Sequence, residues 1–308
     1  MASILTNSSA MSALSTLRSI ASSMESTQNA ISTGMKVSKA SDNAAYWSIS
    51  TTMKSDNMAL AAVNDALGVG AAKVDTGYAG MESAIDVMKE IKAKVVAAKE
   101  EGVDKAKIQE EITQLKDQLV SIAKSASFNG ENWLAAETMG DKTVVSGFVR
   151  DASGNVGVKT TTYTLAASNV LYQLDAQGEV DAAGDSILTS GDNVTVAGAA
   201  AAVASIKIND LDVTGDDLDV ALASVDLALT KMTSAGAELG SISKRIDLQS
   251  SFSSKLSDAI EKGVGRLIDA DMNEESTRLK ALQTQQQLAI QALSIANNDS
   301  QNILSLFR

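Results

Sequence analysis

Residues 279–308 read LKALQTQQQLAIQALSIANNDSQNILSLFR, and this stretch decides the fold class. One series of positions alternates steps of three and four, which is the heptad spacing of a coiled-coil seam: Leu279, Leu282, Gln286, Ala289, Leu293, Ala296, Ser300, Ile303 and Phe307. Further apolar residues lie off that seam, at Leu288, Ile290, Ile295, Leu304 and Leu306. A surface helix of a monomer would carry Lys and Glu there, yet from residue 281 onward only Asp299 and Arg308 are charged. We therefore expect a helix that is covered on more than one side.

The other end of the chain has the same character, because Arg18 is the only charged side chain between residues 1 and 24. One apolar stripe runs through Met11, Leu14, Leu17, Ala21, Met24 and Ile31, and Leu5 and Ile20 fall beside it. Two such ends can cover each other on one face only, so their other faces are predicted to bind further subunits. The residues predicted for self-assembly are Leu5, Met11, Leu14, Leu17, Met24, Ile31, Leu282, Leu288, Leu293, Ile295, Ile303, Leu306 and Phe307.

Helical spacing also dominates the segments next to both ends. Residues 81–98 and 108–126 predict two helices joined at Gly102 as an antiparallel hairpin, with Asp104 as the N-cap of the second. A further helix is expected over residues 49–74, and a longer one over residues 218–246. Trp47 and Trp133 are interpreted as packing residues where helices meet.

Residues 141–214 differ, because Thr, Val, Gly and Asp dominate and short runs alternate in polarity. Residues 158–165, 193–196 and 205–208 are predicted β-strands. Residues 141–216 contain ten acidic and four basic residues, and an acidic insert between helical arms favours a solvent-facing outer domain. A disordered acidic loop is the alternative. The predicted fold class is mainly α with a β-rich insert: a terminal coiled coil of residues 1–40 and 270–308, a helical bundle of 41–140 and 215–269, and the insert.

Composition excludes several kinds of function. The net charge of −12 disfavours binding to nucleic acid or to anionic membranes. His and Cys are absent, which removes the commonest general base, the Cys nucleophile and the usual zinc ligands. Pro is absent too, which suits long unbroken helices. No cofactor, metal site or catalytic residue is predicted, and no cleavable signal peptide is visible.

The chain resembles the bacterial flagellin family in five motifs that occur in the family's order. The segment NAISTGMKVSKASDNAAYWSIS (residues 29–50) is similar to the N-terminal signature, a turn followed by a helix start, and SFNG (127–130) is similar to the element that ends the N-terminal half. The C-terminal matches are LGSISKR (239–245), IDADM (268–272) and QNILSLFR (301–308). Together the matches cover about three quarters of the chain.

The resemblance implies a secreted structural subunit, exported by the flagellar type III apparatus, that polymerises into the filament used for swimming. It also implies partners: other flagellin subunits including paralogues, the filament cap, the hook-junction proteins and an export chaperone. Asp42 and Asn43 depart from the commonest pattern, and Glu90 lies at or next to a position that is basic in flagellins recognised by the animal innate receptor. These departures argue against immune recognition and resemble flagellins of plant-associated alphaproteobacteria.

Two other functions stay open at this point. A hook–filament junction protein would resemble flagellin at both ends, and an enzyme could be housed in residues 141–214. The Asp-x-Asp-x-Asn run at residues 269–273 resembles the start of a calcium loop, but Glu274 and Lys280 replace its glycine and its bidentate glutamate. A solvated helix start, or a contact between the terminal coiled coil and the helical bundle, is therefore the favoured interpretation of that run.

Overall fold

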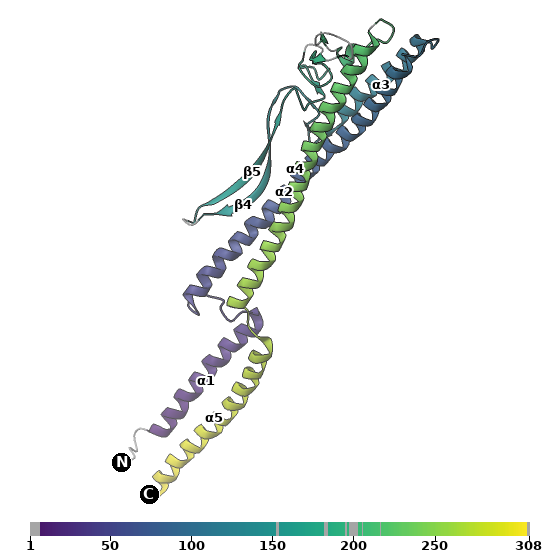
Figure 1. The fold of residues 1–308 in the computed structure, drawn as a ribbon. Helices are drawn as coiled ribbons and strands as arrows, with labels where there is room; N and C mark the ends of the chain where they lie inside the picture. Colours follow the sequence, from purple (N-terminus) through teal and green to yellow (C-terminus); the bar gives the residue numbers. More distant parts are fainter. Residues whose placement is uncertain are drawn as a thin grey trace. The chain divides into compact units, whose positions relative to one another are not determined.

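The computed structural model describes residues 7–151, 154–181, 184–194, 196, 203–204, 206–215 and 217–306 (Figure 1). The chain divides into two compact units. The first unit consists of Met1–Met58 and Leu256–Arg308, and the second is Ala59–Lys255. No helix among the described residues is long and apolar enough to cross a lipid bilayer.

The first unit is built around α1 (Ser8–Thr33) and α5 (Met272–Leu306), which lie side by side and antiparallel (Figure 1). Asn7 caps the start of α1 by accepting from Ala10 N at 3.0 Å, and its Nδ2 donates to Ala296 O of α5 at 3.0 Å. Gly34 ends α1 with φ 70°, a left-handed conformation that glycine adopts without strain. The turn predicted by the N-terminal signature is thus confirmed.

A small core closes the other end of this pair. Lys36 N donates to Ile268 O at 2.7 Å and Ala270 N donates to Gly34 O at 2.9 Å, so the segments after α1 and before α5 are joined through the backbone. Val37, Val264 and Ile268 are buried there, packed against Met35, Met53, Ile260 and Leu267. These contacts also bring the start of α2 and the end of α4 into the first unit.

The second unit is built on α2 (Ala44–Ala97), α3 (Lys105–Ser125) and α4 (Leu218–Ile268). The hairpin at Gly102 is confirmed, with φ 92° at that glycine, although the Asp104 side chain makes no capping hydrogen bond. The expectation of separate helices over 49–74 and 81–98 was wrong, because α2 is continuous. Its glycines cost helix propensity, but Gly70, Gly77 and Gly80 admit neighbouring side chains close to the backbone.

Three short strands follow α3 within residues 127–136, which were predicted to belong to the helical bundle, and the insert of residues 141–214 contains one long hairpin and further short strands. Strands β1 (Ser127–Phe128) and β2 (Glu131–Asn132) pair antiparallel, and β3 (Ala135–Ala136) pairs parallel with β6 (Tyr172–Gln173). The long hairpin joins β4 (Gly140–Arg150) to β5 (Val156–Leu165), with a bulge between Val145 and Gly147. Strand β7 (Asn193–Val194) pairs with β8 (Val203–Ala204), and a 3₁₀ turn, η1, spans Ile208–Asp210.

The strand predictions succeed in part. Residues 158–165 are confirmed as strand, and the strand predicted at 193–196 is described only over Asn193–Val194. The strand predicted at 205–208 was wrong, since Ile208 begins η1 and Ser205 lies outside the described residues. The reason lies in packing: Ile206 N donates to Ser224 Oγ of α4 at 2.9 Å instead of to a neighbouring strand.

The insert and the helices share one hydrophobic core. Buried residues of the insert, among them Val144, Tyr163, Leu171 and Leu188, belong to the same cluster as the buried residues of α2, α3 and α4. Trp133 stacks on Tyr163 with ring centroids 5.3 Å apart and an interplanar angle of 10°. Trp133 is therefore a packing residue as predicted, whereas that interpretation was wrong for Trp47, whose side chain is exposed near the start of α2.

Two glycines of α2 offer a matched test of this close packing. A Cβ at Gly68 would meet nothing within 4 Å, but a Cβ at Gly70 would lie 2.1 Å from Val144 Cγ1. We expect Gly68→Ala to stabilise the protein by about 0.5–1 kcal/mol through helix propensity. Gly70→Ala is expected to destabilise it by about 1–3 kcal/mol through overpacking. Urea unfolding followed by circular dichroism measures both, and equal effects would contradict the close approach of β4 to α2.

Candidate assembly surface

The seam predicted on α5 is the face that α5 turns toward its partner helix. Leu279, Leu282, Gln286, Ala289, Leu293 and Ala296 are half-buried at alternating steps of three and four, and the residues between them are exposed. The seam is therefore confirmed over these positions. The side chains of Ser300, Ile303 and Leu306 lie outside the description although the backbone is helical, and Phe307 lies outside the described residues altogether.

On α1 the contact face differs from the predicted stripe. The residues turned toward α5 are Ala10, Ala13, Leu17, Ile20, Met24 and Thr27, all half-buried or buried. Met11, Leu14 and Ala21 are exposed instead, so the predicted register of the stripe was wrong by one position at these points. Ile31 is half-buried, and Leu5 lies outside the described residues. The small side chains of Ala10 and Ala13 allow the close approach of α5 on this face.

The faces turned away from the seam carry several large apolar side chains. The exposed fractions are 65% for Met11 and 39% for Leu14 on α1, and 60%, 52% and 69% for Leu288, Ile290 and Ile295 on α5. We call these five residues the outer apolar set. Large exposed apolar side chains on neighbouring helices mark interaction sites in soluble proteins. The set suits burial against further helices of the same kind, since few charges interrupt it.

The three residues predicted to affect immune recognition occupy two places on the fold. Asp42 Oδ2 accepts from the backbone N–H groups of Lys39 and Ser38, each at 3.0 Å, and these bonds hold the pKa of Asp42 below its ordinary value. Asn43 caps α2 by accepting from Tyr46 N at 3.1 Å. Glu90 is exposed on α2. The turn and helix start of the N-terminal signature are thus one local structure, and Glu90 belongs to the second unit.

The Asp-rich run at 269–273 forms a helix start. Asp271 Oδ1 accepts from Asn273 N at 2.9 Å and from Glu274 N at 3.3 Å, which is N-capping geometry for α5. This confirms the helix start, the first of the two interpretations favoured from the sequence. Among the residues whose placement is described, no cluster of three or more acidic side chains is arranged to hold a metal ion.

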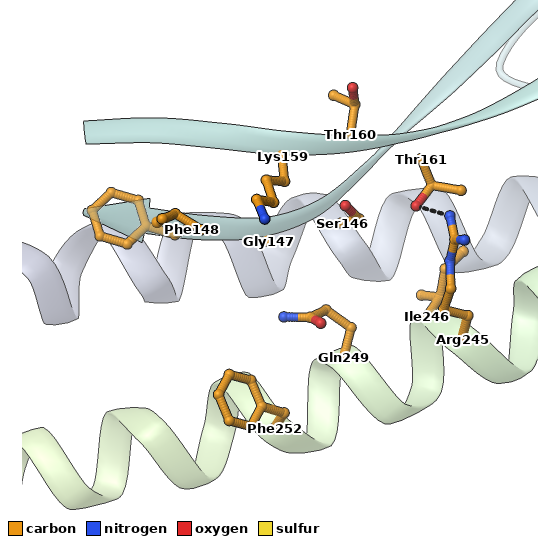
Figure 2. A pocket seen from close by; sticks show the side chains of 11 residues that line it. Ser146, Gly147, Phe148, Lys159, Thr160, Thr161, Arg245, Ile246, Gln249 and Phe252 are labelled. Carbon is orange, nitrogen blue, oxygen red and sulfur yellow. Dashed lines mark hydrogen bonds between the residues drawn. The ribbon is translucent and has the colours of Figure 1, made fainter. Parts of the chain in front are cut away.

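A groove of about 440 Å³ lies between the β4–β5 hairpin and α4 (Figure 2). Its walls include Phe148 and Lys159 from the hairpin and Arg245, Gln249 and Phe252 from α4. Arg245 Nη2 donates to Thr161 Oγ1 of the hairpin. The lining residues of the groove include no carboxylate.

Some residues that hold the terminal helices together were not identified from the sequence. Asn7 ties the start of α1 to α5, and Ala10 and Ala13 form the close contact. Asn7 had a readable signal, because an Asn just before a helical run is a common N-cap. The alanines had none, since alanine is frequent on every face of these helices.

Comparison with known proteins identifies the family. Residues 4–138 match the model of the bacterial flagellin N-terminal helical region, and residues 222–307 match that of the C-terminal helical region. Flagellin A of Rhizobium meliloti (strain 1021) is 56% identical over 394 aligned residues, and the flagellin of Brucella melitensis biotype 1 is 46% identical over 312, with 100% of both chains covered in each case. A crystal structure of Bacillus cereus flagellin is similar at TM-score 0.40 and 20% identity, over 62% of this chain and 88% of that one. The chain therefore belongs to the flagellin family, the non-enzymatic structural subunits of the extracellular filament that bacteria use for motility.

Proposed function

We propose that the chain polymerises through the faces of α1 and α5 that point away from their mutual seam. The observation that carries this proposal is the outer apolar set of Met11, Leu14, Leu288, Ile290 and Ile295, which is exposed on charge-poor segments of two helices. The seam satisfies one face of each helix, and burial of the remaining apolar surface favours association with further copies. Repeated head-to-tail contacts between identical subunits generate an open helical polymer.

The proposal extends to the other predicted self-assembly residues. Leu17, Met24, Ile31, Leu282 and Leu293 hold α1 against α5 and thereby present the outer apolar set, while Leu5, Ile303, Leu306 and Phe307 continue the helices' sequence pattern toward the chain ends. Residues 1–40 and 270–308 would form the terminal coiled coil and residues 141–214 an outer region. Asp42, Asn43 and Glu90 are expected to make recognition by innate receptors weak.

The partners follow from the family. Rhizobium meliloti has several flagellin paralogues, including A, B and D, and all three are similar to this chain over its full length. We propose that this chain co-assembles with such paralogues, contacts the filament cap and the hook-junction proteins at the polymer's ends, and binds an export chaperone before assembly.

The test is seeded elongation. Purified chain is added to sheared filament seeds under salting-out conditions, and filament length is measured by electron microscopy. We expect long filaments, because each added subunit buries its outer apolar set and offers a new surface. A hook–filament junction protein would add only a short segment, so failure to elongate would favour that alternative.

A further inference from the structure

We propose that Met11 is an oxidation site through which hydroperoxides decide whether a free subunit can join a filament. The inference rests on the proposed function, because it requires that the outer apolar set be buried during assembly. Its basis is the unequal placement of the chain's methionines between protected and exposed surfaces.

Three methionines with large exposed fractions stand out. These are Met11 at 65%, Met58 at 69% and Met272 at 44%, whereas Met81, Met88 and Met232 are fully buried in the second unit. Met11 alone of the three exposed residues lies in the outer apolar set, one helical turn before Leu14. Met24, the other methionine of α1, is half-buried on the seam with α5. On α1, the thioether of Met24 therefore faces α5, and the thioether of Met11 lies on the surface proposed to contact the next subunit.

The chemistry needs only an exposed thioether and a hydroperoxide as oxidant. The sulfur lone pair attacks the outer peroxide oxygen, an S–O bond forms, the O–O bond breaks, and water or an alcohol leaves. The sulfur is oxidised to the sulfoxide and the peroxide is reduced. The reaction uses no general base or metal, which agrees with a chain that has no His or Cys.

The sulfoxide changes how Met11 fits an apolar interface. It is a strong hydrogen-bond acceptor on a surface that must give up its water on assembly, and a buried acceptor without a donor is unfavourable. Two of the neighbouring hydroxyls are already engaged: Ser15, one turn further along α1, donates to Ser12 O at 2.9 Å, and Thr16 donates to the same oxygen at 3.1 Å. Oxidation at Met11 therefore opposes assembly without removing any contact of the α1–α5 seam.

The same placement makes the effect depend on the state of assembly. In the free subunit Met11 is accessible to peroxide, whereas in a filament built through the outer apolar set it is covered. Oxidation then removes free subunits from assembly and leaves existing filaments intact. Reduction of the sulfoxide by methionine sulfoxide reductase returns those subunits to assembly.

The experiment treats folded subunits and preformed filaments with hydrogen peroxide, follows oxygen addition at each methionine by peptide mass spectrometry, and measures seeded elongation. In free subunits we expect oxidation of Met11 and at least a roughly tenfold rise in the concentration needed for elongation. In filaments we expect Met11 to stay reduced. Met11→Leu should elongate normally before and after peroxide, and Met11→Gln should reproduce the defect without peroxide. Met58→Leu and Met272→Leu serve as matched controls, because peroxide should still impair the elongation of these variants through Met11.

Two outcomes would overturn the inference: equal loss of elongation in peroxide-treated Met11→Leu and native subunits, or normal elongation by Met11→Gln. The Leu14→Asp variant distinguishes failure of the oxidation inference from failure of the proposed assembly function. If Leu14→Asp blocks elongation while Met11→Gln does not, the assembly surface stands and only the oxidation switch fails. If both elongate normally, the assembly surface itself is wrong.

Discussion

Leu14→Asp is expected to abolish filament formation while leaving the helical content of the protein nearly unchanged. Leu14 is 39% exposed on the face of α1 that points away from α5, so the substitution places its charge where no partner of the same chain is displaced. On assembly that carboxylate must be desolvated against apolar side chains, at a cost of about 3 kcal/mol or more per subunit, which is roughly a hundredfold in the assembly equilibrium. Seeded elongation measures the loss, and circular dichroism confirms that α1–α5 stay folded.

The matched control carries the same change on a different surface. Val158, on the β4–β5 hairpin, is 58% exposed and lies far in sequence from both terminal helices. We expect Val158→Asp to polymerise normally. Filaments from Leu14→Asp, or equal failure of the two variants, would contradict the assignment of assembly to the terminal helices.

Leu293→Asp should also block assembly, but by another route. Leu293 lies half-buried on the seam of α5, so a carboxylate there separates α1 from α5 before any second subunit is involved. Ellipticity should fall for Leu293→Asp and not for Leu14→Asp. This difference in ellipticity distinguishes a disrupted α1–α5 pair from an intact pair whose outer apolar set no longer binds other subunits.

The sequence correctly predicted the seam positions of a terminal helix where only one heptad series was possible. On α5 the small and amide residues at Gln286, Ala289 and Ala296 left one heptad series that could serve as a seam, and that series is the one turned inward. On α1 large apolar residues stand on both faces, with Leu14 on the predicted stripe and Ile20 on the observed contact face, so periodicity alone did not place the seam. Only the partner helix decides between the two faces, and the partner is 289 residues away where Asn7 meets Ala296.

The insert shows a different limit of sequence reasoning. Strand β5 was predicted because its residues alternate in polarity from Val158 to Leu165, and in the structure its buried positions alternate with exposed ones toward Leu165. Its partner β4 was missed: the burial pattern along Gly140–Arg150 is irregular, and the bulge at Val145 and Gly147 breaks the alternation. The shared core could not be inferred either, since contacts such as Val144 against Gly70 join positions that are distant in sequence and carry no local signal.

This shared core changes what a deletion of the insert should do. An outer domain with its own core could be removed with little effect on the helices, which is the expectation that composition alone supports. Here Val144, Tyr163, Leu165, Leu171 and Leu188 are buried against α2, α3 and α4. Deleting residues 141–214 exposes the helical partners of all of them.

We therefore expect the deletion of residues 141–214 to abolish the cooperative unfolding transition of the second unit. Loss of one large buried side chain costs about 2–5 kcal/mol, and the sum over the insert exceeds the whole stability of a typical domain. Thermal unfolding by calorimetry measures this. The first unit should be affected less, because the contacts between α1 and α5 are all its own.

A shorter deletion separates the insert's buried part from its exposed part. Replacing residues 146–159 with Asn-Gly would join Val145 to Thr160, which already face each other in the ladder, through a two-residue turn. The removed tip carries the exposed Val149, Val156 and Val158 and also the half-buried Phe148, so the second unit should keep its unfolding transition at somewhat lower stability and the protein should still elongate seeds. An intact transition after removal of all of 141–214 would show that the helices do not depend on the insert. Loss of the transition on removal of the tip alone would show that packing within residues 146–159, such as that of Phe148 against the core, is essential.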